Sequence, residues 1–397
     1  MKRTYAFILM AIFLMTGCNA ETSSPVLMRK DILADYDYLI SMIRDNYPFL
    51  NVNKRLNGVD WLQEAEVYRA SAPNTASHTQ VVSWFQDLIA KLHNGHASVV
   101  GSQAEYQYLV NLYGNKKEAQ PWTELLGDPS VLNTYGILGN KTSGLPKKID
   151  VQKSSFMVSF LDGQTAYINI PSFSEKFIPN EMKALSAFLP TVKEANRLII
   201  DIRDNSGGSD AYWQQLVQRI IPEPIRWRYY NLLRGTYIKP FIEAQTRNPF
   251  ESISQLNELP ETVSSALPED VIRDFSRFFP ASVHLKPENS IQFKGRIYLI
   301  VSPKVFSSSE KFASFAKSTG WATLVGERTG GDGLGADPVL VKLPHSHLIV
   351  RLPLIMGVTE QGVINEEKKT DPDIWVDTAK NPILLEDQAV RAILDHQ

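Results

Sequence analysis

The chain has 397 residues, of which 43% are hydrophobic and 10% aromatic. This length exceeds what one ordinary hydrophobic core organises, and the composition provides enough apolar surface to offset chain entropy, which excludes wholesale disorder. Lysine and arginine number 41 against 43 acidic residues, a net charge of -2 without a basic run, so we expect no nucleic-acid partner.

The N-terminus has the pattern of a bacterial export signal. Lys2 and Arg3 precede an apolar run, residues 5–15, which is too short to cross a membrane as a mature helix. The segment Met15-Thr16-Gly17-Cys18 is similar to a lipobox, in which the signal peptide is removed and the cysteine sulfur carries a diacylglycerol. We expect residues 1–17 to be a lipoprotein signal peptide and residues 18–26 to be the lipidated N-terminus and linker. The alternative is an ordinary secretory peptide with an incidental cysteine.

Cys18 is the only cysteine of the chain. Disulfides within the chain, thiolate metal clusters and a cysteine nucleophile are therefore excluded, and we expect no metal and no cofactor. Asn19 rather than an aspartate follows the cysteine, which in enterobacterial lipoproteins favours the outer membrane. We expect a protein of the bacterial cell envelope, anchored to the membrane through lipid on Cys18 and facing the periplasm. The oligomeric state is not readable.

Helix-spaced apolar residues predict a small N-terminal helical domain over residues 27–100. Its first helix ends before Pro48, and its third begins with the capping box that Ser77 and Gln80 form. The expected helices cover residues 32–47, 61–70 and 78–92. Residues 101–150 give no strong periodicity, and their structure stays open.

Strands and helices alternate after residue 150, which predicts an α/β fold with a mostly parallel sheet covered by helices. The expected strands are residues 156–160, 165–170, 198–202, 297–301, 322–325 and 374–376. The expected helices are residues 181–195, 211–220 and 308–317, with a closing helix from Leu384. A hairpin is expected to turn near His345. We expect residues 101–397 to form one α/β core, in which residues 222–292 are long enough to be a lid or an insertion.

Ser307 follows an apolar strand and a short turn and precedes a helix start. This position would place its hydroxyl at the rim of the sheet, and the helix N-terminus would supply amide donors for a developing oxyanion. The alternative is that Ser307 and Glu310 form a capping box, and the segment by itself favours that interpretation.

Two other segments carry residues of chemical interest. Gly207 and Gly208 follow a buried strand, so their N–H groups could hold a carbonyl oxygen or a phosphate, or could simply make a tight turn. His96 follows Gly95 at the end of a helix, where it could serve as a general base. With His93 it could equally be a surface pair, and the spacing is not that of a metal site of the His-Glu-X-X-His kind.

These segments, in this order, resemble the C-terminal processing (tail-specific) peptidase family, which includes the tricorn protease core. The segments that resemble family motifs together cover about half of the chain. They are Asn94-Gly95-His96, the strand from Tyr167 to Phe173, and the segments from Ile200 to Gly208, Phe306 to Glu310, Gly326 to Gly331 and Glu366 to Ile374. The resemblance implies a core like those of crotonase and the Clp peptidase, with Ser307 as the nucleophile.

The chain departs from the family at the general base. The processing peptidases use a lysine where this chain has Asp332, and an unperturbed aspartate is too weak a base to deprotonate a serine hydroxyl efficiently at neutral pH. The tricorn-like branch uses histidine with a glutamate behind it, and those positions match His96 and Glu366. The resemblance therefore implies Ser307 as nucleophile, His96 as base and Glu366 as its orienting carboxylate.

The same resemblance implies an oxyanion hole that combines the amide of Ser308 with that of Gly207 or Gly208. No PDZ domain is recognised between His96 and Tyr167. The expected activity is that of a serine peptidase acting on exported proteins or peptides through an acyl-enzyme intermediate.

The sequence also allows two rival interpretations. The segment Ser308-Ser309-Glu310-Lys311 fits the Ser-X-X-Lys motif of penicillin-binding enzymes, but the Arg-Thr-Gly at residues 328–330 follows too closely to be the distant third motif of that class. The stronger rival is a non-catalytic ligand- or peptide-binding lipoprotein, because interphotoreceptor retinoid-binding domains resemble this fold and carry ligands. Asp332 keeps that alternative open.

Overall fold

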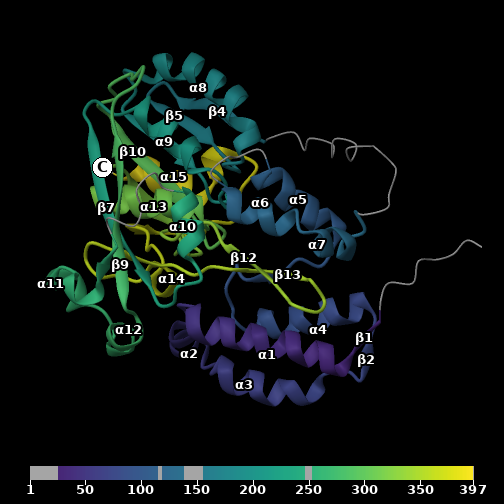
Figure 1. Ribbon diagram of the computed structural model, residues 1–397. Helices are drawn as coiled ribbons and strands as arrows, with labels where there is room; N and C mark the ends of the chain where they lie inside the picture. The colour runs from purple at the N-terminus through teal and green to yellow at the C-terminus, as the bar shows by residue number, and fades with distance from the viewer. Residues whose placement is uncertain (1–25, 115–118, 138–154, 246–252, 397) are drawn as a thin grey trace, which may run out of the picture.

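The computed structural model describes residues 26–114, 119–137, 155–245 and 253–396. Helices from the N-terminal part of the chain lie below a larger body that is built around a β-sheet (Figure 1). The expected signal peptide and Cys18 lie outside the described residues. Over the ranges described, no helix is both long and apolar enough to span a membrane.

The N-terminal helices form where apolar residues recur on one side of each. The four helices are α1 (Arg29–Asn46), α2 (Leu50–Asn57), α3 (Trp61–Tyr68) and α4 (His78–Ala90), with a short ladder of β1 (Leu27–Met28) and β2 (Thr75–Ala76). α1 buries Ile32, Leu39 and Ile43 and stops just before Pro48, as predicted. The capping box of Ser77 is present at the start of α4. The sequence did not predict α2.

Three further helices lie in the region whose structure the sequence left open: α5 (Gln103–Tyr113), α6 (Gln120–Leu126) and α7 (Pro129–Thr134). They pack beside a three-stranded sheet of β12 (Val339–Lys342), β13 (Ile349–Leu352) and β3 (Ser98–Val99), in which β12 and β13 are the hairpin expected near His345. The indole of Trp122 donates to the carbonyl of Pro338 at 2.9 Å. β3 follows His96 directly, so this small sheet holds the histidine segment in place.

The central sheet has six strands in the order β15, β11, β10, β6, β5 and β4. Every neighbouring pair is parallel except that of β4 and β5. The strands are β4 (Met157–Asp162), β5 (Thr165–Asn169), β6 (Arg197–Asp201), β10 (Arg296–Val301), β11 (Thr323–Gly326) and β15 (Ile374–Trp375). Because β6, β10 and β11 run in parallel, the loops that leave their carboxyl ends meet at one edge. Those loops carry the glycine pair, Ser307 and the segment leading to Asp332.

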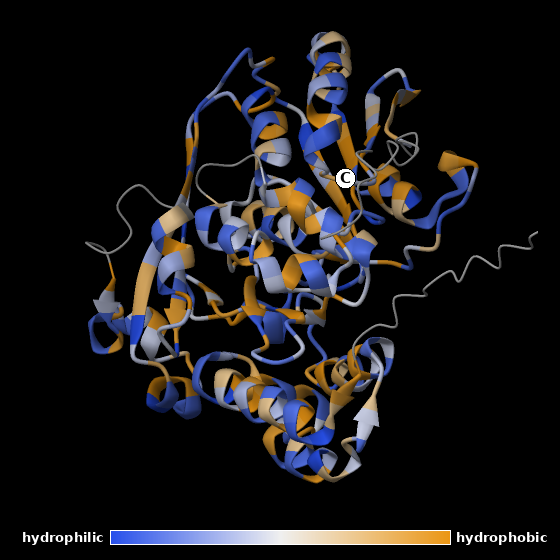
Figure 2. Cartoon of the chain, turned by 45° about the vertical axis from the view of Figure 1, so that its right-hand side comes forward, coloured by the Kyte–Doolittle hydropathy of each residue, from blue (hydrophilic) through white to orange (hydrophobic). Residues whose placement is uncertain are grey.

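Helices cover both faces of this sheet, as predicted. α8 (Ile178–Val192), α9 (Asp210–Gln218) and α13 (Ser308–Thr319) pack on one face, and α15 (Gln388–Asp395) packs on the other. Successive residues of β6 alternate between the two sides: Leu198 and Ile200 belong to the first hydrophobic cluster and Ile199 to the second. In Figure 2 the strands at the centre are mostly hydrophobic, while the helices around them change from hydrophobic to hydrophilic around their axes.

Within the range 222–292, the described residues form a long two-stranded ribbon with short helices at its far end (Figure 1). β7 (Ile225–Leu233) pairs along its whole length with β9 (Arg277–Leu285), and β14 (Met356–Thr359) and β8 (Ser254–Gln255) extend the sheet. α10 (Lys239–Gln245), α11 (Glu261–Ser264) and α12 (Glu269–Asp274) complete the segment. Trp227 packs into the core of the central sheet, whereas Leu232 packs into the core shared with the N-terminal helices. The ribbon therefore connects the hydrophobic core of the central sheet to the hydrophobic core that contains the N-terminal helices.

Candidate active site

Ser307 lies in the turn between β10 and α13, where the sequence predicted it. Its backbone has φ 58° and ψ -127°, a conformation that residues with a side chain rarely adopt and that costs free energy. The turn is held from the other side by Gly331, whose carbonyl accepts the Ser307 N–H at 3.3 Å. The side chain of Ser307 makes no capping hydrogen bond to α13, so the capping-box alternative does not describe this serine.

The hydroxyl of Ser307 faces His96 instead. Its Oγ lies 3.1 Å from His96 Nε2, which is hydrogen-bonding distance between a nucleophile and a general base. The imidazole lies against the ring of Phe306, with centroids 4.5 Å apart. A Cβ added at Gly95 would lie 2.8 Å from the Phe306 ring, so the glycine lets the histidine segment approach the serine turn this closely.

Asp332 holds the other side of the imidazole. Its Oδ2 lies 2.7 Å from His96 Nδ1, and its side chain is only 5% exposed. Glu366, the residue expected in this place, does not contact the imidazole; Asp332 does. Asp332 reaches the ring because it sits in the glycine-flanked loop after β11, with φ 52°, directly behind the serine turn. Ser307, His96 and Asp332 thus form a continuous chain of hydrogen bonds.

Glu366 lies one step further away, in α14 (Asn365–Lys368). The amide of Asn94 separates it from the triad, because Nδ2 donates to Glu366 Oε1 and to Asp332 Oδ2, each at 2.9 Å. The second oxygen, Oε2, is buried and has no hydrogen-bond partner among the described residues. Burial, and then the negative charge of Asp332, raise the pKa of Glu366 well above its ordinary value. The uncharged acid is therefore the favoured form of this side chain.

The backbone amides near Ser307 are the candidates for oxyanion donors. The loop from β6 to α9 brings the glycine pair against the serine turn, so that a Cβ on Gly207 would lie 2.9 Å from Ser307 Cβ. The N–H of Gly207 is already engaged, since it donates to the Asn205 side chain at 2.9 Å. The expectation that Gly207 supplies the donor is therefore not met. The N–H groups of Gly208 and Ser308 have no acceptor within the described parts of the chain, which fits the remaining expectation.

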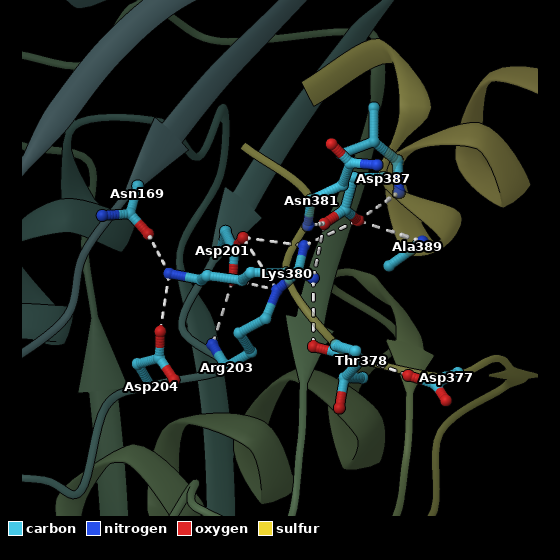
Figure 3. Close-up of polar contacts among 12 residues, drawn as sticks. Asn169, Asp201, Arg203, Asp204, Asp377, Thr378, Lys380, Asn381, Asp387 and Ala389 are labelled. Carbon is cyan, nitrogen blue, oxygen red and sulfur yellow. Dashed lines mark hydrogen bonds and ion pairs between the residues drawn. The ribbon is translucent and has the colours of Figure 1, made fainter. Parts of the chain in front are cut away.

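A buried ion-pair network anchors the glycine loop. Figure 3 shows the guanidinium of Arg203 between the carboxylates of Asp201 and Asp387, with all three side chains no more than 2% exposed. Arg203 bonds Asp387 through two parallel contacts, of 2.9 and 3.0 Å. Such bidentate pairs fix geometry as well as charge. The network is structural, because it ties the end of β6 to the segment before α15.

A second ion pair, which is partly buried, lies at the start of α13. Asp210 is the first residue of α9, and its carboxylate accepts the Ser308 hydroxyl at 2.6 Å and the Lys311 ammonium at 2.7 Å. The ammonium also lies over the ring of Tyr229, 5.8 Å from its centroid. Asp210 therefore connects the two segments that carry the candidate oxyanion amides. The Ser-X-X-Lys pair of the sequence belongs to this contact, where the charge of Asp210 favours the ammonium form over a free amine.

Glu310, which the sequence offered as half of a capping box, is fully buried behind the serine turn. Its Oε1 accepts hydrogen bonds from Asn365 at 2.7 Å and from Thr370 at 2.6 Å. Burial raises the pKa of Glu310 to about 7. The carboxyl group therefore links α13 to α14, the helix that also carries Glu366, and to Thr370 just beyond it.

Sequence reasoning missed three residues of this site. The role of Asp332 was not predicted, because this residue occupies the position at which the processing peptidases have their lysine base. Asn94 was named only as part of the motif that carries His96 and was given no role, and Asp210 was not singled out. A signal existed for Asn94, since asparagine after a helix end commonly caps the next turn, and its Oδ1 does accept the N–H groups of His96 and Ala97. For Asp210 no local signal exists, because its partners lie about a hundred residues away in the chain.

A family comparison agrees with the geometry. The model of the family described as Peptidase family S41 matches residues 164–376, which is more than half of the chain. The chain belongs to peptidase family S41. It is accordingly a serine-type peptidase. The matched residues include Ser307, Asp332 and Glu366, whereas His96 precedes them.

Solved structures share the fold of this S41 peptidase. A protein from Parabacteroides merdae that is described as a peptidase matches with a TM-score of 0.58 and 20% sequence identity. The match covers 93% of this chain and 96% of that one. Mature CPAF has a TM-score of 0.55 and 15% identity, covering 88% and 93%. Mature CPAF complexed with lactacystin has a TM-score of 0.54 and 16% identity, covering 92% and 97%. These likenesses extend beyond the family match to the N-terminal helices, so the whole arrangement is an S41 fold.

Proposed function

We propose that this S41 peptidase cleaves peptide bonds through an acyl-enzyme intermediate, with Ser307 as nucleophile, His96 as general base and Asp332 as the carboxylate that orients the imidazole. The observation that carries the proposal is the unbroken chain of contacts, 3.1 Å from Ser307 Oγ to His96 Nε2 and 2.7 Å from His96 Nδ1 to Asp332. A carboxylate at Nδ1 favours the tautomer with its proton on that nitrogen. Nε2 then carries the lone pair that accepts the serine proton.

The proposed reaction has two stages. Ser307 Oγ attacks the carbonyl carbon of the scissile peptide bond while its proton passes to His96 Nε2, and the carbonyl oxygen becomes an oxyanion facing the amides of Gly208 and Ser308. The C–N bond then breaks, and His96 returns the proton to the leaving amine. In the second stage a water gives a proton to His96 and attacks the ester, which releases the carboxylate product and restores the serine hydroxyl.

The substrates proposed are peptides or proteins outside the cytoplasm. This part of the proposal is supported by the basic and apolar segment of residues 1–17 and by the lipobox that ends at Cys18. Lipid on Cys18 would tether the peptidase to the cell envelope, in the outer membrane and facing the periplasm. Expression with a labelled fatty acid tests the anchor: Cys18→Ser should lose the label and leave the membrane fraction. Retention of the label by that variant would contradict lipidation at this residue.

The catalytic proposal is tested by covalent labelling. A fluorophosphonate probe reacts with activated serines, so the wild-type chain should be labelled and Ser307→Ala should not. Ser314→Ala is the matched control, because it removes another buried serine hydroxyl of α13 that lies outside the proposed site. Labelling of Ser307→Ala would mean that another residue is the nucleophile. A wild-type chain that is never labelled, but is stabilised by an added peptide, would be a binding protein on the same fold.

A further inference from the structure

The side chain of Asn94 lies at the centre of the polar groups behind His96. It is 9% exposed and uses both ends of its amide. Oδ1 accepts the backbone N–H groups of His96 at 2.9 Å and of Ala97 at 3.1 Å. Nδ2 donates one hydrogen to Asp332 Oδ2 and the other to Glu366 Oε1. All the strong hydrogen-bonding capacity of this amide is thus satisfied inside the site.

The orientation of the amide is determined by its surroundings. The oxygen end faces two backbone donors, which only an acceptor can satisfy, while the nitrogen end faces two carboxyl groups, which need donors. A rotation that exchanged the two ends would break all four contacts. The two amide hydrogens therefore have a fixed direction toward Asp332 and Glu366.

These two carboxyl groups cannot both be ionised at low cost. They share a mostly buried space, and the free oxygen of Glu366 has no donor within the described residues to support a charge. Asp332, by contrast, has the imidazole and one amide hydrogen on a single oxygen. Lys369 and Glu310 are the other charged or titratable groups whose charges act on Glu366, one favouring and one opposing its ionised form. The contacts therefore favour a single negative charge, located on Asp332.

We propose that Asn94 is a positioning residue, which holds the Asp332 and Glu366 carboxyls with its two amide hydrogens so that the negative charge faces His96 Nδ1. The proposal rests on the triad put forward above. Asn94 does not touch the reacting atoms. It acts through Asp332, and its contribution depends on the donor character of Nδ2 rather than on the size of the side chain.

Two substitutions separate this role from a structural one. Asn94→Asp keeps an oxygen that can accept the N–H groups of His96 and Ala97, but it replaces both donors with an acceptor. Asn94→Ala removes acceptor and donors together. If Asn94 only held the backbone turn, Asn94→Asp would resemble the wild type and Asn94→Ala would be the poorer enzyme. The positioning role predicts that Asn94→Asp is the poorer enzyme and that Asn94→Ala is the better one, because the carboxylate introduced at residue 94 would repel the two carboxyl groups that it faces.

The measurement is the reaction of Ser307 with a fluorophosphonate, with the maximal labelling rate separated from the half-saturating probe concentration. We expect Asn94→Ala to lower the maximal rate by about tenfold and Asn94→Asp by about a hundredfold at neutral pH, with half-saturation nearly unchanged. Asn169→Asp is the control, since it makes the same change at a similarly buried asparagine whose amide contacts Ser155 and Lys380. Asn94→Asp reacting as fast as, or faster than, Asn94→Ala would overturn the proposal.

A second readout does not depend on catalysis. In the Ser307→Ala chain, proton NMR should show a low-field resonance from the His96 Nδ1–H that is bonded to Asp332. Adding Asn94→Asp should shift this resonance upfield or broaden it, while Asn169→Asp should leave it in place. An unchanged resonance in the Asn94→Asp chain would contradict the positioning role. If the wild-type chain is not labelled at all, the triad proposal fails, and the resonance still decides whether Asn94 sets the contact between Asp332 and His96.

Discussion

Asp332 and Glu366 share one hydrogen-bond donor but differ in the rest of their surroundings. Asp332 faces the imidazole of His96, whereas the free oxygen of Glu366 is buried without a partner among the described residues. The two side chains end in the same carboxyl group. The contacts favour its charged form in Asp332, beside the imidazole, and its protonated form in Glu366. This difference at the residue scale decides which side chain can stabilise the imidazolium.

The division of roles leads to a paired prediction. Asp332→Asn should lower kcat by a factor of about 10³ to 10⁴, because an amide favours the wrong imidazole tautomer and cannot stabilise the positive charge. Glu366→Gln should lower kcat by less than about tenfold, because burial raises the pKa of Glu366 and so favours the uncharged acid, which the neutral amide of glutamine matches in shape. Steady-state hydrolysis of a fluorogenic peptide, or fluorophosphonate labelling, measures both. A larger effect at Glu366 than at Asp332 would restore the arrangement inferred from the sequence.

Glu310 should make stability depend on pH. Its pKa is raised by burial from 4.5 to about 7 in the folded chain, so folding takes up a proton between these values. The stabilisation is complete below about pH 4.5 and is lost as the pH rises through about 7, with a change on the order of 3 kcal/mol. Glu310→Gln cannot titrate, so the fall in its Tm from pH 5 to pH 8 should be smaller than that of the wild type. Equal slopes for the two proteins would contradict this assignment.

At the scale of elements, the site depends on how two strand-to-helix connections meet. The loop from β6 to α9 and the turn from β10 to α13 each supply one candidate oxyanion amide. Asp210, at the start of α9, is bound by Ser308 and Lys311, at the start of α13. The distance between the two amides is therefore set by a contact between helix ends rather than by either loop alone.

Removing one member of this contact should cost both stability and rate. Lys311→Met leaves the carboxylate of Asp210, whose side chain is 33% exposed, without its cation, so we expect a loss of about 2 kcal/mol in the free energy of unfolding. The double variant Asp210→Asn with Lys311→Met should recover most of this stability, because no charge is left unpaired. It should keep a lowered kcat, because the amides are no longer held together. Urea unfolding and peptide hydrolysis test the two parts separately, and full recovery of kcat would exclude the positioning effect.

At the scale of the whole molecule, three separate regions converge on Arg55 of α2. Its guanidinium makes paired contacts with Glu367 of α14, at 3.0 and 2.7 Å, and with Asp270 of α12, at 2.8 and 2.9 Å. The residue therefore ties the N-terminal helices both to the ribbon segment and to the helix that carries Glu366. The bidentate geometry of the Glu367 pair and the partial burial of both pairs make these contacts stronger than those of an exposed ion pair.

The global role of Arg55 can be measured by unfolding. Arg55→Ala should lower the free energy of unfolding by about 1 to 2 kcal/mol, because the side chain of Glu367 is only 9% exposed and would lose its cation. Arg44→Ala is the matched control, since Arg44 and Asp45 form an ion pair in which both side chains are more than half exposed. Its effect should stay within about 0.5 kcal/mol. Equal losses in the two variants would show that the contacts of Arg55 add no more than a surface pair.

Local patterns were enough to predict the elements that surround the site. The apolar spacing that ends before Pro48 and the capping box at Ser77 predicted α1 and α4, and alternating strands and helices predicted the sheet. These signals are local, since they depend on neighbours within one or two turns. The helices α5 to α7 were not predicted because they are short, with 11, 7 and 6 residues, and because they pack in one hydrophobic cluster with the distant hairpin of β12 and β13. Their stability comes from tertiary packing rather than from their own periodicity.

Motif order by itself selected the candidate nucleophile, Ser307, and the candidate base, His96, because each follows a break in a regular element that leaves its side chain available. Only the tertiary structure decided between Asp332 and Glu366, and between Gly207 and Gly208. The reason is physical: the direction of a carboxylate or an N–H group depends on which partners lie within about 3 Å, and these partners come from remote parts of the chain. The sequence determines the residue types, whereas folding determines their hydrogen-bond partners and which of their charged forms is favoured.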